Sequence, residues 1–145
     1  MRKLWQMEKV LLRGFTLSEL MVMMAVFSIL ATIAIPLYAN AQARARIEQA
    51  QANVRLLASA VTKYKDHMGM LPPALTLLMH PAVNGLNQSA GPFLDFSALE
   101  VPQGGTPAWG AYTYTSSTAG TFRIDVAGDG TTITATGDGT TITAP

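Results

Sequence analysis

The most informative part of this 145-residue chain is residues 13–36, which read RGFTLSELMVMMAVFSILATIAIP. A basic residue and a glycine open the stretch, and apolar side chains dominate it from Phe15 onward. As an α-helix rising about 1.5 Å per residue, residues 15–35 would span roughly 30 Å, which is enough to cross a bilayer core. The only charge in this span is Glu19, and an acidic side chain in lipid costs about 3 kcal/mol unless it finds a partner. The sequence therefore predicts a membrane helix whose carboxylate needs a cation.

Three kinds of N-terminal segment account for such a stretch to different degrees. An ordinary signal anchor explains the basic flank and the apolar run but not Glu19. A conventional secretory signal could be cleaved at Ala39-Asn40-Ala41, although its apolar core would be only about 7–15 residues long. In the third kind, residues 1–14 are a leader that is cut after Gly14. The new α-amine on Phe15 then lies one helical turn from Glu19 and can neutralise it.

Four residues stand where a known N-terminal signal requires them: Gly14, Phe15, Glu19 and Pro36. The pattern resembles the signal of type IV pilins and type II secretion pseudopilins. This resemblance implies that a prepilin peptidase cuts after Gly14 and N-methylates Phe15. It also implies that Glu19 meets the amine of a neighbouring subunit during assembly. Pro36 removes a helix hydrogen bond, which predicts either a kink or the end of the membrane span.

Composition limits what the rest of the chain can be. The chain has no cysteine, so an exported domain must be stabilised by packing or by a bound ion rather than by disulfides. The basic residues before the apolar run keep the leader cytoplasmic and send the C-terminal part across the membrane. The formal net charge of +1 comes from the basic leader, and without residues 1–14 the net charge is about −2, so nothing suggests a nucleic-acid surface. No nucleophile–base set or nucleotide-binding motif is visible, so we predict that the protein is not an enzyme.

After Pro36 the sequence remains helical in pattern but becomes amphipathic, over residues 37–69. The alanine- and glutamine-rich composition favours helix, and Gly69 ends it. We expect residues 37–52 to pack against other subunits and the second half to pack on a globular head. The apolar residues recur at helical spacing: Ile47, Val54, Leu57, Val61, Tyr64 and Met68.

The remaining sequence predicts a connecting region and a small sheet. Residues 70–108 are rich in proline, glycine and asparagine, with a possible short helix at 73–79. Residues 109–145 are rich in threonine and aromatic residues and predict an antiparallel meander of three or four strands. The octapeptide GDGTTITA occurs at 128–135 and again at 137–144, and each copy predicts an Asp-Gly turn before a strand. The predicted fold class is α+β, with a long N-terminal helix packed against this meander.

The C-terminal part is similar to the head of the major pseudopilin of type II secretion. The similarity rests on a Trp-Gly pair and a Tyr-x-Tyr pattern, in a strand expected over residues 109–116, and on a Gly-aromatic-x-Ile strand at 120–124. It implies a calcium ion in the late loop, for which Asp125, Asp129 and Asp138 could supply oxygens. Turn chemistry alone also accounts for these aspartates, so both interpretations stay open.

Together the resemblances imply a structural subunit rather than a catalyst. We expect a pseudopilin that is inserted in the inner membrane with a periplasmic head. It would polymerise through its N-terminal helix into a periplasmic fibre for protein export, together with other pseudopilins and an inner-membrane assembly platform. Two alternatives stay open. One is a type IV pilus subunit for adhesion, motility or DNA uptake, and the other is an unassembled, membrane-anchored binding module.

Overall fold

The structure is a computed structural model, and it describes residues 14–95, 100–137 and 139–143. It contains a long α-helix, a short 3-10 helix and two antiparallel sheets, which confirms the predicted α+β class. The contacts divide the chain into two units, Met1–Ala39 and Asn40–Pro145. Among the described residues, all the buried apolar side chains belong to the second unit.

Helix α1 spans Leu17–Met68 and contains Pro36. The helix is continuous through the proline, so the predicted membrane segment and its amphipathic continuation form one element. Gly69 ends the helix in a left-handed conformation, with φ +74°. Its N–H donates to the carbonyl of Lys65 at 2.7 Å, which satisfies one of the last helical acceptors.

The apolar stripe predicted on α1 faces the core of the second unit. Val54, Leu57 and Val61 have no exposed surface, which confirms the stripe. The buried face begins earlier than predicted, because Ala50 is also fully buried and Ile47 packs against the same cluster. This face of the helix is therefore used within the chain from Ile47 onward, and packing of residues 37–52 on other subunits stays a prediction for the remaining faces.

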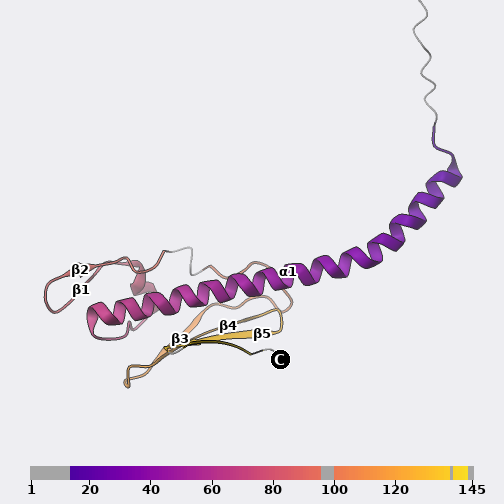
Figure 1. Cartoon of the computed structure of the whole chain (residues 1–145). Coiled ribbons are helices and arrows are strands. Elements are labelled where there is room, and N and C mark those ends of the chain that lie inside the picture. Colours follow the sequence, from indigo (N-terminus) through magenta and orange to yellow (C-terminus); the bar gives the residue numbers. More distant parts are fainter. Residues whose placement is uncertain (1–13, 96–99, 138, 144–145) are drawn as a thin grey trace, which may run out of the picture. The chain divides into compact units, whose positions relative to one another are not determined.

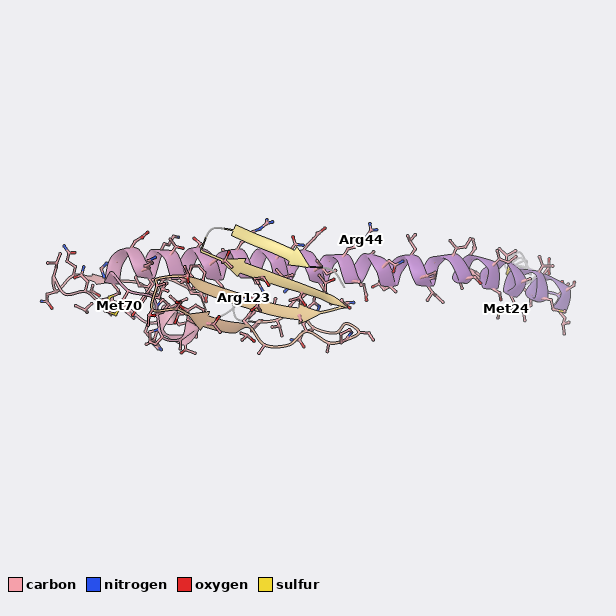
Figure 2. The ribbon with its side chains drawn as sticks, turned by 90° about the horizontal axis from the view of Figure 1, so that it is seen from below. Met24, Arg44, Met70 and Arg123 are labelled. Carbon is pink, nitrogen blue, oxygen red and sulfur yellow. The ribbon has the colours of Figure 1, made fainter. Side chains whose placement is uncertain are left out.

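The larger sheet is the predicted meander, with four strands in the order β3-β4-β5-β6. Every neighbouring pair is antiparallel. Its strands lie below the second part of α1 in Figure 1. In Figure 2, which views the chain from below, the strands lie in front of the same part of the helix. The strands are β3 Thr113–Ser116, β4 Phe122–Gly128, β5 Thr131–Thr136 and β6 Gly139–Thr143.

Buried and more exposed side chains alternate along β4, and the buried ones pack the sheet on the helix. Phe122, Ile124 and Val126 are buried, whereas the residues between them are more exposed. On β5, Ile133 and Ala135 have no exposed surface. These side chains join those of α1 in two hydrophobic clusters, so burial of one sheet face against one helix face holds the second unit together.

The first copy of the octapeptide forms the turn that its sequence predicts. Asp129 and Gly130 connect β4 to β5 and have φ angles of +47° and +69°. Positive φ at both central residues is the type I′ pattern of two-residue hairpins, for which Asp-Gly is a favoured pair. The turn therefore follows from local sequence.

The second copy behaves differently. Gly139, predicted as a turn residue, is instead the first residue of β6 and pairs with Thr136. The prediction was wrong because strand pairing, rather than the local dipeptide, sets the register here. The observed backbone register pairs residue 142 of β6 with Ile133 of β5.

The strand predicted over residues 109–116 is wrong in its first half, since β3 begins at Thr113. Trp109 is only 7% exposed and packs directly on Gly128, where a Cβ would come within 2.4 Å of the indole ring. Gly110 donates its N–H to the backbone of β4 at 2.9 Å. Trp109 therefore enters the core from a loop, and glycine is required opposite it.

The connecting region, residues 70–108, has more structure than predicted. The possible helix at 73–79 is the 3-10 helix η1, Leu75–Met79, which buries two leucines against the core. A small hairpin follows that the sequence analysis did not predict. It consists of β1 Ala82–Val83 and β2 Ser89–Ala90.

Candidate processing and assembly site

The predicted cleavage site lies just before α1. Phe15 is 73% exposed, and nothing lies within 4 Å of the position that a Cβ on Gly14 would take. Within the part of the chain that the structure describes, the Gly14–Phe15 bond is therefore open to a peptidase. The cleavage itself and the N-methylation of Phe15 stay predictions.

Glu19 caps the first turn of α1 together with Thr16. The N–H and the hydroxyl of Thr16 both donate to Glu19 Oε2, at 2.8 and 2.7 Å. In return, the N–H of Glu19 donates to Thr16 Oγ1 at 3.2 Å. Reciprocal bonds between a threonine and a glutamate three residues later form a capping box. The carboxylate also lies where the helix dipole favours negative charge.

Thr16 is a site residue that the sequence analysis missed. In the uncut chain the nitrogen of Phe15 is an amide, so the α-amine predicted as the partner of Glu19 does not yet exist. Thr16 gives the carboxylate hydrogen bonds before cleavage. The signal was present, because Thr16-Leu17-Ser18-Glu19 has the Thr-x-x-Glu spacing of a capping box. Pairing of Glu19 with an amine after cleavage stays a prediction.

The helix that follows exposes an apolar surface. Every side chain from residue 14 to residue 42 is exposed, including Phe27 at 65% and Pro36. By length and composition α1 can cross a membrane, with a mean hydropathy of 2.5 over its most apolar 18 residues. Ser28 and Thr32 donate their hydroxyls to the carbonyls four residues earlier, so these polar groups are satisfied within the helix. Such a surface needs lipid or protein to cover it.

Asp129, one of the three predicted calcium ligands, is bound by other parts of the second unit. Arg46 donates through Nε to Oδ2 at 2.6 Å and through Nη2 to Oδ1 at 3.1 Å. Trp109 Nε1 donates to Oδ2 at 3.0 Å, and the N–H of Thr106 donates to Oδ1 at 3.0 Å. The hydrogen bond from Arg46 is the main cause that lowers the pKa of Asp129 to about 2, although burial opposes it.

Asp125 lies on β4, away from this turn, and has its own cation. Arg123 Nε donates to Asp125 Oδ2 at 2.7 Å, and the hydroxyl of Thr134 donates to Oδ1. The Arg123 hydrogen bond lowers the pKa of Asp125 against the effect of burial. Asp138 lies outside the described residues. Across 14–95, 100–137 and 139–143, no three histidine, cysteine, aspartate or glutamate side chains form a group suited to a metal.

Sequence reasoning did not find the partners of Asp129. Arg46 is 83 residues away from it in the chain, and no local pattern connects the two. Trp109 was noted only as part of a head motif, and its indole N–H proves to reach the same carboxylate. Only the packing of the sheet on α1 brings these groups together.

Known proteins share the N-terminal features. Residues 13–35 match the family model described as the prokaryotic N-terminal methylation motif. The type IV major pilin PilE of Neisseria gonorrhoeae is 42% identical over 60 residues, which cover 41% of this chain and 36% of that pilin. A fimbrial protein of Neisseria meningitidis serogroup B is 42% identical over 60 residues, covering 41% and 35%. PilA, a type IV major pilin of Myxococcus xanthus, is 48% identical over 48 residues, covering 33% and 22%. No solved structure matches.

In its N-terminal part the chain is type IV pilin-like, and its Gly14–Phe15 junction lies inside the matched methylation motif. This confirms the predicted family. The chain spans only about a third or less of the length of these relatives. All three are named as pilins or fimbrial proteins, so they do not carry the narrower assignment to secretion pseudopilins.

Proposed function

We propose that this protein is a structural subunit of a type IV pilus-like fibre, matured by cleavage after Gly14 and N-methylation of Phe15. One observation supports the proposal above the others. An exposed apolar helix begins shortly after the glycine, carries one carboxylate in its first turn, and has this first part inside a methylation motif at residues 13–35. Lipid covers the apolar surface before assembly, and the helices of neighbouring copies cover it afterwards.

In this proposal the partners and the location follow from the course of maturation. The precursor lies in the inner membrane with its head in the periplasm. A prepilin peptidase processes it, and an inner-membrane assembly platform delivers it to a polymer of the same chain. The protein itself catalyses nothing.

Glu19 changes partner during this process. In the precursor its carboxylate is bound by Thr16, which satisfies it within the helix. Cleavage creates a cationic α-amine on Phe15. In the fibre the carboxylate of one subunit pairs with the amine of its neighbour, because an unpaired charge in an apolar interior is strongly unfavourable. A subunit in the wrong register leaves Glu19 unpaired, so the pairing selects the register.

Three substitutions test the proposal in cells by mass spectrometry of the N-terminus and by fibre yield. Gly14→Val is expected to leave the leader uncut, because a β-branched side chain obstructs the peptidase. Glu19→Val is expected to be cut but to give no fibres. Glu19→Gln keeps a carbonyl oxygen that can accept from Thr16 but removes the charge, and it is also expected to give no fibres.

The Glu19→Gln variant distinguishes the capping hydrogen bond to Thr16, which it can keep, from the negative charge, which it loses. Normal fibres from Glu19→Gln would contradict a register set by ion pairing. If cells with Glu19→Val form no fibres but keep the wild-type phenotype, an anchored binding module would be favoured. Ser18→Ala is the matched control, since Ser18 neighbours Glu19 in the same turn and its hydroxyl lies 3.1 Å from Thr16 Oγ1 rather than bonding the carboxylate. It is expected to be processed and assembled like the wild type.

Two destinations remain for the fibre. The relatives named as major pilins favour a surface pilus for adhesion, motility or DNA uptake. The second candidate is a pseudopilin of type II secretion, and two features of the chain favour it. These are the buried Trp109 next to Gly110 and the absence of cysteine. Electron microscopy at native expression decides: long extracellular fibres support the pilus. The pseudopilin is supported if the wild type shows no surface fibres and deletion of the gene causes proteins that are normally exported to stay inside the cell.

A further inference from the structure

We propose that the late loop of the head is held by an internal cation, the guanidinium of Arg46, and that it therefore needs no calcium. Three segments of the second unit meet at this guanidinium and its partner, Asp129. They are the part of α1 that carries Arg46, the loop at residues 104–109, and the type I′ turn between β4 and β5. The inference concerns only the head and is independent of the proposed fibre.

The carboxylate of Asp129 has no free capacity for a metal ion. An ionised carboxylate offers about four lone-pair positions. Each oxygen of Asp129 accepts two hydrogen bonds at 2.6–3.1 Å, from Arg46, Trp109 and the backbone of Thr106. A calcium ion at this carboxylate would have to displace donors that are already in place.

The space around the carboxylate is also filled. A Cβ on Gly105 would lie only 2.8 Å from Asp129 Oδ1, so the loop backbone already packs against that oxygen. The side chains of Arg46 and Asp129 are 19% and 7% exposed, and water therefore has little access to the pair. Backbone bonds hold the two segments together as well, since the N–H of Asp129 donates to the carbonyl of Pro107 at 2.8 Å.

Charge argues in the same direction. Calcium in proteins takes six to eight oxygen ligands, with several carboxylates among them. Here each described candidate carboxylate is already matched by an arginine, Asp129 by Arg46 and Asp125 by Arg123. A planar guanidinium that donates side-on through two nitrogens is well suited to hold a carboxylate in one orientation. Arg46 thus supplies both the charge and the directional bonds that a metal would bring.

The test is thermal unfolding of the full-length protein in detergent, followed by the fluorescence of Trp109. Replacing Trp5 by Phe leaves Trp109 as the only tryptophan, and its indole N–H reports directly on Asp129. The midpoint is expected to be the same with millimolar calcium chloride and with a chelator. Arg46→Ala is expected to lower the midpoint by at least about 5 °C, and calcium is not expected to restore it.

Arg44→Ala is the matched control. Arg44 is on the same helix two residues earlier, is exposed, and makes no hydrogen bond or ion pair within the described ranges (Figure 2). Its midpoint is expected to equal that of the wild type. Arg46→Lys keeps the charge but loses the two-nitrogen fork, so an intermediate midpoint is expected.

Two results would overturn the inference. A higher midpoint of the wild type with calcium would mean that the folded head binds the ion. An Arg46→Ala midpoint equal to that of Arg44→Ala would mean that the guanidinium does not hold the loop. If Arg46→Ala does not accumulate, hydrogen exchange of the Thr106 and Asp129 amides in Arg46→Lys carries the test. Faster exchange than in the wild type is then expected, and unchanged exchange would contradict the inference.

Discussion

Asp129 makes the stability of the head depend on pH in a defined direction. Its pKa is about 2 in the folded chain, and an aspartate in an unfolded chain titrates near about 3.9. Because the folded pKa is the lower one, its stabilisation is complete above the unfolded pKa. It is lost as the pH falls through about 2. The free energy of unfolding of the wild type should therefore exceed that of Asp129→Asn most at neutral pH.

Denaturant unfolding at a series of pH values checks this expectation. The difference between the wild type and Asp129→Asn should shrink from about pH 5 downward and level off only below about pH 2, where the carboxyl of Asp129 is protonated in the folded chain as well. A difference that stays constant over this range would show that the ionised carboxylate does not contribute to folding. Other carboxylates titrate in both proteins, so the difference isolates this one.

Asp129 also shows how far single residues can be predicted from sequence. Its place in a turn was correctly predicted, because Asp-Gly is a favoured pair for the positive φ angles of a type I′ turn. Its partners were not, because Arg46 and Trp109 come from distant positions and only the folded core unites them. Thr16 was the opposite case, since a local spacing that was overlooked would have revealed its contact with Glu19.

At the scale of elements, two neighbouring leucines test which face of α1 holds the sheet. Leu57 has no exposed surface, whereas Leu56 is 56% exposed. Leu57→Ala leaves a cavity and is expected to destabilise the head by about 2–5 kcal/mol. Leu56→Ala removes the same atoms from the other face and is expected to change stability by less than about 0.5 kcal/mol.

Denaturant unfolding of both variants at neutral pH measures the contrast. Equal losses would mean that the sheet does not select this face of the helix. A larger loss for Leu56→Ala would require the two faces to be exchanged. Since the substitutions are identical in chemistry, differences in intrinsic helix propensity cancel.

The amphipathic helix and the antiparallel meander were predicted correctly, whereas the register of the second octapeptide and the start of β3 were not. The stripe on α1 repeats at helical spacing over many turns, so its buried face could be read from the sequence. The two copies of GDGTTITA are identical, yet Gly130 lies in a turn and the equivalent Gly139 lies in a strand. Local sequence cannot distinguish them, because the difference arises from which strand each copy pairs with.

At the scale of the whole molecule, the division at Ala39 separates a unit with an exposed apolar surface from a unit with a buried core. Exposed large apolar side chains are concentrated at residues 15–38, and the described core lies wholly in the second unit. A chain that starts at Asn40 is therefore expected to be monomeric and soluble without detergent. Size-exclusion chromatography compares it with the full-length chain, which is expected to aggregate unless detergent or lipid is present. Aggregation of the shortened chain would mean that the first unit also completes the head.

The tandem octapeptide gives this protein a simple route to change by gene duplication. One nine-residue period contains one strand and one turn, and its strands β5 and β6 lie at the end of the meander. Copying a further period would lengthen the sheet by one strand at its margin and leave the helix-facing core untouched. Each copy would also reverse the direction of the last strand. The number of periods therefore sets the direction in which the last strand of the repeat runs, and thus the end of the sheet to which that strand leads.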